Sequence, residues 1–453
     1  MKKLLTLLLC VCMLSSAIVL IGCGSEDGIS INGHSLTDFK VVIPSECDKT
    51  TEYAAKNLVL LLKEKTGVEL TIITDSEEET ECEILVGETN RDLSKDATLE
   101  LKDKEYLLLA KGSKIVVKGA GIYVGGACND LVNNHLVGAI NKKGENANVK
   151  SIPKKQIALE YTFKDTYDSV IFMIGDGMGF QHVAMTEKNK IGTFVGNLFP
   201  VSAKSVTRSL SVMNGEAGYT DSAASATAMS TGFKTINKHL GVDENGTVLK
   251  NVRELARESG AKTAVITTDV ITGATPSAYL CHHPSRHDTE ILQGQIDALI
   301  ANKEIDYIAG DVANDLTLKV AEALELISKD SKFFIMVEEA MIDKASEKQD
   351  IWATIGHVAR FNDAITYATQ FALCHPNVAL IVTADHETGK LTPYPALGPG
   401  FMFESYSHTN YNVPVYAIGA GVEALNGKTL ENTELAQFSA KAFSGAEFGK
   451  NYN

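Results

Sequence analysis

Residues 170–179 read Val-Ile-Phe-Met-Ile-Gly-Asp-Gly-Met-Gly, a run of five apolar side chains that ends in a carboxylate between glycines. A short apolar run bounded by glycine predicts a strand that is buried on both faces. Asp176 then stands at the carboxyl end of this strand, where the glycines leave room for a metal ion or a phosphate. Gly-Asp-Gly is also an ordinary turn sequence, so both interpretations stay open for this stretch alone.

Similar apolar runs recur at 264–267, 333–337 and 379–382, with helical patterns such as 252–259 between them. This alternation predicts an α/β fold with a doubly wound, mostly parallel sheet. Ligand sites in such folds lie beyond the carboxyl ends of the strands, which is where most polar motifs of this chain fall. We expect a signal peptide over 1–22, a small α/β domain with a linker over 23–160, and the doubly wound domain over 161–453.

The small domain has its own pattern of short elements. The expected elements are strands at 41–44, 70–73 and 84–87, a hairpin at 106–118, and helices at 51–66 and 123–136. This order, together with Leu-Val-Gly-Glu-Thr-Asn-Arg at 85–91, resembles the N-terminal non-catalytic domain of α-glucuronidase and chitobiase-type glycoside hydrolases. The resemblance implies a possible glycan partner, and a spacer role stays open. Residues 141–155 are expected to form the linker.

The charge balance narrows the class of partner. The 453 residues carry 42 Lys and Arg against 57 Asp and Glu, a net charge of −15. An acidic chain disfavours nucleic acid as a partner. An anionic substrate would need local cations or metal ions to attract it. The mean hydropathy of −0.01 excludes a multi-span membrane protein.

The N-terminus predicts export. Met-Lys-Lys precedes an apolar stretch that ends in Leu20-Ile21-Gly22-Cys23, which resembles a bacterial lipobox. The resemblance implies a protein outside the cytoplasm, held at the membrane by a lipid on Cys23, and a plain secretory signal stays open. The five later cysteines are widely spaced, so we expect no disulfide framework and leave open one bridge in the small domain.

The block Thr-Asp-Ser-Ala-Ala-Ser-Ala-Thr-Ala-Met-Ser-Thr-Gly at 220–232 predicts a helix. Thr220 or Asp221 can cap its start, and Gly232 can end it. Ser222 would then lie in the first turn, where free backbone N–H groups favour an anion. The small side chains also suit close packing on the sheet, so a purely structural helix is the alternative.

Further polar residues follow the other predicted strands. Arg286 comes after Thr275-Pro276 and His282-His283, and its planar guanidinium can bind two phosphate oxygens at once. The two histidines are expected to be scaffold.

An acidic segment follows the strand at 333–337. It begins with Glu338 and contains Asp343, Lys344 and Glu347. Asp343 and Glu347 are spaced to share one helix face, so they can hold one ion, and a solvated acidic helix start is the alternative.

A last group of metal-ligand types comes late in the chain. Asp385-His386 follows the strand at 379–382, and His408 precedes an expected strand at 413–418. An adjacent Asp-His pair at the end of a strand rarely serves structure alone, which indicates a functional site there. For the loop residue His408, a purely structural role is the alternative.

The ordered motifs Asp-Gly-Met-Gly, Thr-Asp-Ser-Ala-Ala-Ser-Ala-Thr-Ala, Ala-Thr-Pro…Arg, Glu…Ile-Asp-Lys, Thr-Ala-Asp-His and His-Thr resemble the alkaline phosphatase family over 165–420. The resemblance implies metal-dependent hydrolysis of small phosphate monoesters outside the cytoplasm, with release of inorganic phosphate. Ser222 would be the nucleophile and would form a phosphoserine intermediate.

The resemblance also implies two zinc sites. Asp176, Asp385 and His386 match the ligands of the Zn²⁺ that activates the serine. Asp343 and His408 match ligands of the Zn²⁺ that binds the leaving oxygen. Two such cations would also explain how an acidic protein binds an anion.

The remaining matches concern magnesium and the phosphate. Asp176, Thr275 and Glu338 match the Mg²⁺ site of the family. Arg286 matches the residue that clasps the phosphate, and Lys344 matches a lysine that holds phosphate through water.

Two positions depart from the family. Glu347 stands where a zinc-binding histidine is usual, which should favour Mg²⁺, Mn²⁺ or Ca²⁺ over Zn²⁺ at that site. Gly273 stands where Asp or His is usual, so the third site would be weak or completed by water. The short segment between His386 and His408 predicts an open site with modest selectivity for the alcohol.

Other functions remain as alternatives. A phosphodiesterase of the same superfamily is one, and a weakly active phosphate- or glycan-binding surface lipoprotein is another. A sulfatase is excluded because its Cys-x-Pro-x-Arg or Ser-x-Pro-x-Arg pattern would place Cys or Ser where this chain has His282.

Overall fold

The computed structural model describes residues 28–138, 148–149, 152–312, 314–329, 331–445 and 447–452. The predicted signal peptide, Cys23 and most of the expected linker lie outside these ranges. Within them, no helix is both long enough and apolar enough to cross a membrane.

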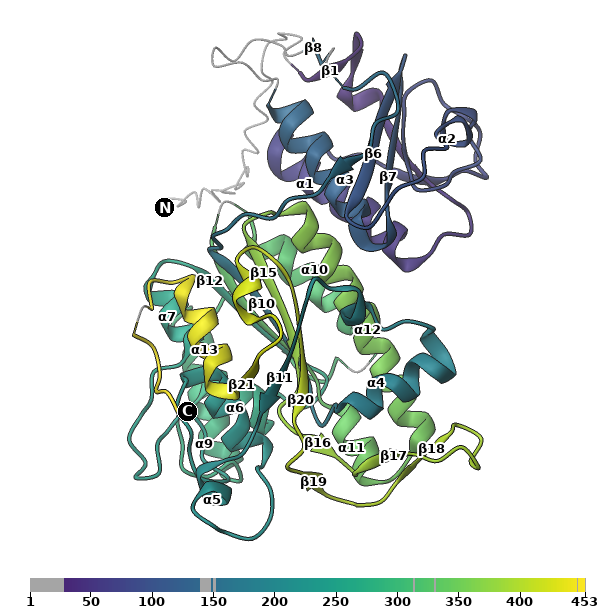
Figure 1. The fold of residues 1–453 in the computed structure, drawn as a ribbon. Helices are drawn as coiled ribbons and strands as arrows, with labels where there is room; N and C mark the ends of the chain where they lie inside the picture. Colours follow the sequence, from purple (N-terminus) through teal and green to yellow (C-terminus); the bar gives the residue numbers. More distant parts are fainter. Residues whose placement is uncertain are drawn as a thin grey trace, which may run out of the picture.

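The N-terminal part is built on a six-stranded sheet of order β4-β3-β5-β7-β6-β9. Its strands are β3 (Lys40–Ile43), β4 (Ile72–Thr74), β5 (Glu83–Val86), β6 (Glu105–Lys111), β7 (Lys114–Gly119) and β9 (Leu159–Glu160). Helices α1 (Lys49–Thr66) and α3 (Val124–Asn129) cover one face, and α2 (Asp92–Asp96) lies toward the other (Figure 1). Gly67 ends α1 in the left-handed conformation at φ 75°, as its position in the sequence predicted.

A small three-stranded sheet joins β1 (Ser30–Ile31), β2 (His34–Ser35) and β8 (Asn148–Val149). β8 falls inside the stretch expected to be a linker, so that expectation is wrong for residues 148–149. The two residues pair with β1 in parallel, which satisfies backbone groups that a free linker would leave to water.

The C-terminal part is built on an eight-stranded sheet of order β13-β12-β14-β10-β15-β20-β11-β21. Its strands are β10 (Ser169–Gly175), β11 (Val201–Val206), β12 (Lys262–Thr267), β13 (Tyr307–Ala309), β14 (Phe333–Glu339), β15 (Val378–Thr383), β20 (Val413–Gly419) and β21 (Thr429–Glu431). The strands from β13 to β15 run parallel, and β20 runs antiparallel to β15 and β11. The predicted mostly parallel sheet is confirmed.

Helices cover both faces of this sheet, which makes it doubly wound (Figure 1). On one side lie α6 (Ser222–Thr231), α7 (Val252–Glu258), α8 (Ala274–Leu280), α9 (Thr289–Ala301) and α13 (Asn432–Lys441). On the other lie α4 (Phe180–Thr186), α10 (Leu316–Ile327), α11 (Met341–Glu347) and α12 (Ile351–Cys374). Short elements at the rim are α5 (Leu210–Met213), β16 (Glu387–Thr388), β17 (Leu391–Pro393), β18 (Phe401–Phe403) and β19 (His408–Thr409).

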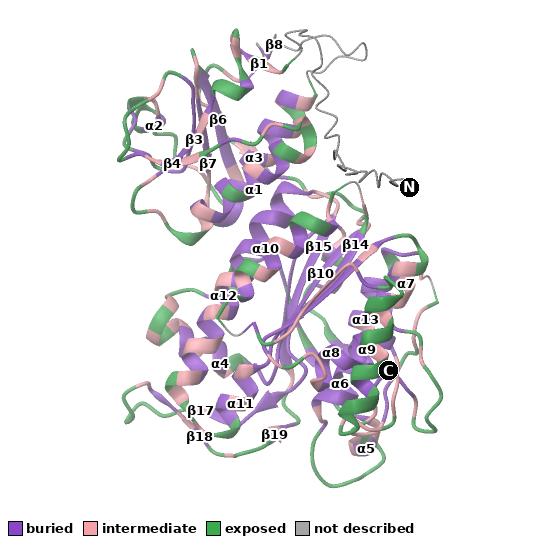
Figure 2. Ribbon diagram, turned by 180° about the vertical axis from the view of Figure 1, so that it is seen from behind, coloured by how far each residue is buried: buried purple, intermediate pink, exposed green. Residues whose placement is uncertain are grey.

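Side chains of the central strand β10 alternate between the two cores. Ile171 and Met173 pack with the α12 side, whereas Phe172 and Ile174 pack with the α6 side. A strand buried on both faces therefore reads as a continuous apolar run. Figure 2 shows the buried central strands between the helical layers.

Helix α12 joins the two sheets through one continuous core. Its Tyr367 ring meets the Tyr53 ring of α1 edge-on, with 5.4 Å between centroids. Gln370 accepts a hydrogen bond from the Gly125 N–H and donates one to the Ile122 carbonyl, both at 2.9 Å. These contacts pack one side of the N-terminal part against the helix layer that contains α12.

The five cysteines among the described residues are free thiols, so the bridge left open for the small domain does not form there.

Candidate active site

The register of the central strands brings three carboxylates to one edge of the sheet. Ile174 of β10 pairs with Glu338 of β14 on one side and with Thr383 of β15 on the other. Asp176 and Asp385 each lie two positions beyond this row, so all three carboxylates stand at the same edge of the sheet. Their clustering follows from parallel strands that end together.

The first group of possible metal ligands is Asp176, Asp385 and His386. His386 Nε2 lies 3.1 Å from Asp385 Oδ2 and 3.5 Å from Asp176 Oδ1. The Ser222 hydroxyl lies 3.3 Å from the same nitrogen. All four side chains are buried.

Two buried oxygens of this group, Asp176 Oδ1 and Asp385 Oδ2, have no hydrogen-bond partner. Orphaned carboxylate oxygens are costly in a protein interior unless a cation or a proton compensates them. Two carboxylates and one imidazole are also a donor set that divalent metals such as Zn²⁺ accept. The residues present therefore fit a bound cation beside Ser222.

The second group is Asp343, His386 and His408. His408 Nε2 lies 3.6 Å from Asp343 Oδ1, and its ring stacks on that of His386 at 3.6 Å between centroids. His408 Nδ1 donates to the Thr220 carbonyl at 2.8 Å, which leaves Nε2 free to bind a metal. Thr388 donates its hydroxyl hydrogen to Asp343.

Glu347 lies at the open side of this second group. Helix α11 places it one turn beyond Asp343, as predicted, and its Oε1 is 3.9 Å from His408 Nε2. Its side chain is 48% exposed, whereas Asp343 is buried. Glu347 can therefore reach the group but is less fixed than the other ligands.

The electrostatics of the cluster favour cations. Burial, followed by the charges of Asp385 and Asp343, raises the pKa of Asp176 well above its usual range. Burial also raises the pKa of Glu338 to about 7, with Asp385 and Asp269 adding to the rise. Burial opposes the charge on Asp385 too, but His386 beside it lowers the pKa of Asp385 to about 2. The cluster holds more negative charge than one imidazolium can balance.

The nucleophile candidate Ser222 is the first residue of α6. Asp221 caps the helix by accepting from the Ala224 N–H at 2.9 Å, and Gly232 ends it at φ 75°, both as predicted. The Ser225 hydroxyl donates to the Asp385 carbonyl at 2.6 Å, which fixes the helix to the strand that carries the metal-ligand candidates. The small side chains of α6 are buried and permit this close packing.

Arg286 lies beside Asp221, the residue before the nucleophile candidate Ser222. Its Nη1 is 3.3 Å from Asp221 Oδ2, and its side chain is partly exposed. His282 supports this loop by contacting the Gly241 carbonyl and Glu254 Oε1, each at 2.8 Å. His282 is therefore scaffold, as expected.

The third predicted group is Asp176, Thr275 and Glu338. The Thr275 hydroxyl oxygen, in α8, is buried and has no hydrogen-bond partner. Glu338 accepts the hydroxyl hydrogen of Thr267. An unpartnered hydroxyl next to carboxylates fits an oxygen-binding cation such as Mg²⁺. Lys344 forms an ion pair with Asp269.

Two carboxylates that shape the site, Glu339 and Asp269, were not among the predicted site residues. Glu338 and Glu339 are buried at the end of β14. The alternative of a solvated acidic helix start is wrong for Asp343, which is buried, whereas Glu347 is half-exposed. Glu339 accepts from the Met341 N–H and contacts His357, both at 3.2 Å. Asp269 lies two residues after the end of β12, and its place just beyond a strand end was the available signal.

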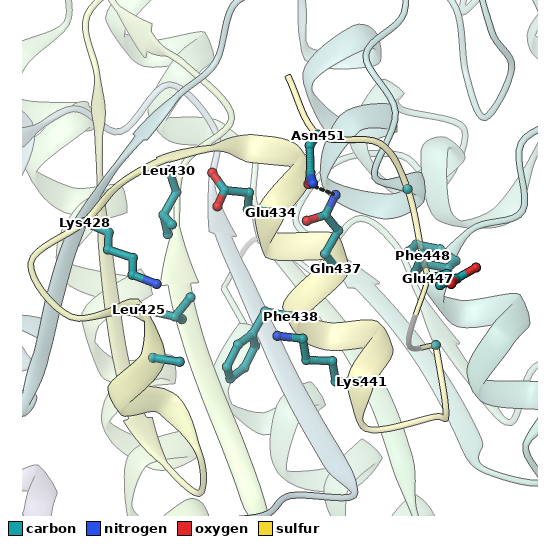
Figure 3. Close-up of a pocket in the computed structure, with 13 residues that line it drawn as sticks. Leu425, Lys428, Leu430, Glu434, Gln437, Phe438, Lys441, Glu447, Phe448 and Asn451 are labelled. Carbon is teal, nitrogen blue, oxygen red and sulfur yellow. Dashed lines mark hydrogen bonds between the residues drawn. The ribbon is translucent and has the colours of Figure 1, made fainter. Parts of the chain in front are cut away.

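The pocket in Figure 3 lies away from this cluster. It is lined by residues of η6 (Val422–Leu425), β21 and α13 and by residues near the C-terminus. Gln437 Nε2 donates a hydrogen bond to Asn451 Oδ1 there, at 3.3 Å. None of the predicted site residues lines it.

Comparisons with known proteins agree with this arrangement. The family model described as "Alkaline phosphatase" matches residues 168–315 and 298–403. Alkaline phosphatase 4 of Bacillus subtilis (strain 168) is 29% identical over 328 residues, covering 59% of this chain and 69% of its own length. Alkaline phosphatase 3 of the same strain is 28% identical and is covered over 62% of its length.

A solved structure shares the fold. Alkaline phosphatase from the Antarctic bacterium TAB5 is 26% identical, with a TM-score of 0.56, over 62% of this chain and 99% of its own. A variant of that enzyme is described with Mg bound in its M3 site.

Proposed function

This chain belongs to the alkaline phosphatase family, and from that premise we propose that it hydrolyses phosphate monoesters through a phosphoserine on Ser222. The observation that carries the proposal is the position of the Ser222 hydroxyl, 3.3 Å from His386 Nε2, beside two groups of metal-ligand types that share His386. A buried hydroxyl with orphaned carboxylate oxygens around it has no evident structural purpose.

The reaction has two displacements. The Ser222 oxygen attacks phosphorus, the bond from phosphorus to the alcohol oxygen breaks, and the alcohol leaves with a proton. A water molecule then attacks the phosphoserine, which releases inorganic phosphate and restores the hydroxyl. Hydrolysis of such esters needs accelerations of up to ~10²¹-fold. A general acid or base supplies only ~10²–10⁴-fold, so most of the stabilisation must be electrostatic.

We assign the proposed cations to the three groups. Asp176, Asp385 and His386 would hold one Zn²⁺, and Asp343 with His408 would hold the other. Bound there, divalent cations would favour the ionised serine and stabilise charge on the leaving oxygen. Glu347 would make the second site harder and open it to Mg²⁺, Mn²⁺ or Ca²⁺.

Thr275 and Glu338, with Asp176, would hold Mg²⁺. Arg286 would bind two oxygens of the phosphate through its planar fork, and its contact with Asp221 aims it toward the start of α6. Helix α6 adds its N-terminal dipole, which favours an anion at Ser222.

The substitution Ser222→Ala tests the nucleophile. We expect it to reduce kcat for 4-nitrophenyl phosphate by at least ~10³-fold, since it removes the group that forms the covalent intermediate. Inorganic phosphate should still bind, as measured by calorimetry. An unchanged kcat would contradict the proposal, and a wild-type protein that binds phosphate without turnover would support the surface-binding alternative.

Substrate class needs a separate comparison. Wild-type kcat/KM for 4-nitrophenyl phosphate should exceed that for bis(4-nitrophenyl) phosphate. The opposite order would support the phosphodiesterase alternative.

We also propose that the enzyme acts outside the cytoplasm on small phosphate esters, held by a lipid on Cys23. Mass spectrometry of the protein from its native membrane should find diacylglyceryl-modified Cys23 at the mature N-terminus. An unmodified soluble form would contradict the anchor.

A further inference from the structure

Gly273 has no side chain, yet the space that a side chain would enter there is occupied by neighbouring atoms. A Cβ atom on Gly273 would lie 3.0 Å from Asp269 Oδ2 and 3.5 Å from Asp269 Cγ. The carboxylate of Asp269 therefore occupies the place into which a side chain at 273 would extend. Gly273 itself immediately precedes α8, the helix that carries Thr275.

Asp269 is tied to two of the predicted site residues. Its N–H donates to the Thr267 hydroxyl at 3.0 Å, and Thr267 in turn donates to Glu338. Its Oδ1 forms the ion pair with Lys344, the residue after the metal-ligand candidate Asp343. The backbone of Asp269 is held as well, because its carbonyl accepts from the Asp311 N–H at 2.7 Å.

We propose that Asp269 supplies, from the loop after β12, the carboxylate that residue 273 lacks, and so acts as a positioning residue for the third cation. This inference rests on the proposed function. Asp269 adds a negative charge beside Glu338 and balances Lys344, whose positive charge would otherwise oppose a cation. The geometry thus compensates for Gly273 without a ligand at that position.

Loss of the Asp269 charge should weaken the binding of a cation at Thr275 and Glu338. Removing the Asp269 carboxylate leaves Lys344 unpaired, so the net charge near Thr275 and Glu338 becomes more positive by one unit. A divalent cation held by Thr275 and Glu338 would lose attraction and gain repulsion from the same change. We expect the Kd for Mg²⁺ to rise by at least ~10-fold, because even a partly screened charge beside Glu338 would act strongly on a divalent ion.

The experiment is calorimetric titration of Mg²⁺ into zinc-saturated protein without substrate. Asp269→Asn keeps the size of the side chain and removes its charge, and should weaken Mg²⁺ binding. Glu338→Gln should also weaken it, which identifies the titrated site. Asp311→Asn is the matched control, since it removes the same charge from an exposed position nearby and should leave the Kd within ~2-fold.

Moving the carboxylate from residue 269 to residue 273 tests whether the two side chains would occupy the same space. Gly273 has φ −55°, which any residue can adopt, and Asp269→Ala removes the two side-chain atoms that a Cβ would meet. The Val270 carbonyl oxygen, 3.0 Å from that Cβ, stays and must shift by a few tenths of an ångström. The double variant Asp269→Ala/Gly273→Asp should bind Mg²⁺ more tightly than Asp269→Ala alone. Circular dichroism and the melting temperature identify variants that do not fold.

The outcomes separate this inference from the proposed function. An Asp269→Asn protein with wild-type Mg²⁺ affinity overturns the inference, and so does a folded double variant that binds no better than Asp269→Ala. Neither result affects the Ser222 proposal, which depends on turnover. Wild-type protein that takes up no Mg²⁺ would overturn both the third-cation assignment and this inference.

Discussion

Among the proposed metal ligands, Glu347 is the residue with the largest expected effect on metal choice. His408 and Asp343 alone make a site that suits Zn²⁺, and Glu347, 3.9 Å from His408 Nε2, adds a hard anionic oxygen. Because its side chain is half-exposed, Glu347 can be replaced without disturbing the core.

Glu347→His should therefore move the second site toward zinc. We expect the zinc content of protein dialysed against equal Zn²⁺ and Mn²⁺ to rise, and the zinc affinity of that site to increase by about 10-fold. Elemental analysis with competitive titration measures both. Glu347→Gln is the control, since it removes the charge without adding an imidazole. Equal metal content in wild type and Glu347→His would show that residue 347 does not ligate.

At the scale of the element, the loop that carries Arg286 depends on one charged histidine. Both ring nitrogens of His282 contact oxygen atoms, Gly241 O and Glu254 Oε1, so the doubly protonated ring fits best. Burial opposes that charge, but Glu254 outweighs it and raises the pKa of His282. A raised pKa means that the folded state favours the protonated form.

The pH dependence follows from this direction. The stabilisation is fully present below about pH 6.5, the unfolded value, and is lost as pH rises through the folded pKa of His282. His282→Gln should therefore lower the free energy of unfolding by about 1–3 kcal/mol at pH 6, and by less at pH 9. Urea denaturation at the two pH values checks this. A constant difference between them would contradict the charged state.

The elements themselves were largely predictable because their signals are local. The apolar runs gave β10, β12, β14 and β15 within two residues, and glycines in the left-handed conformation ended α1 and α6 where expected. The site candidates at strand ends also converge. The strand β20 was expected, but its antiparallel direction was not predictable, and neither was the burial of both Glu338 and Glu339. Strand direction and burial depend on contacts that are distant in the sequence.

The position of Asp269 could not be predicted from the sequence either. The role that we propose for it depends on how the loop after β12 places its carboxylate beside Gly273, and the sequence at residue 273 does not indicate which side chain lies there. Spacing arguments identify ligands on regular elements better than those on loops, since loop geometry does not follow a fixed period.

At the scale of the whole molecule, α12 makes the two sheets parts of one core. Buried side chains of α1 and α3 belong to the same apolar cluster as those of α12 and β10. Gln370 provides buried polar contacts between the two parts. It forms hydrogen bonds with the buried Gly125 N–H and Ile122 carbonyl groups. The two parts should therefore unfold together.

Gln370→Ala tests this cooperation. Loss of two buried hydrogen bonds and of side-chain volume should lower the free energy of unfolding by about 2–4 kcal/mol. Calorimetry should still show one transition, at lower temperature. Gln293→Ala, at an exposed position of α9, should change stability by less than about 0.5 kcal/mol. Two resolved transitions in the wild-type protein would contradict a shared core.

The contact along α12 also limits how this architecture can be rearranged by recombination. A module that replaced residues 28–160 would inherit Tyr367 and Gln370 as its docking partners, whatever its own fold. A chimera would expose an apolar stripe unless the grafted module brought complementary aromatic and backbone groups. Residues 28–160 can therefore be transferred to another hydrolase only together with the side of α12 that carries Tyr367 and Gln370.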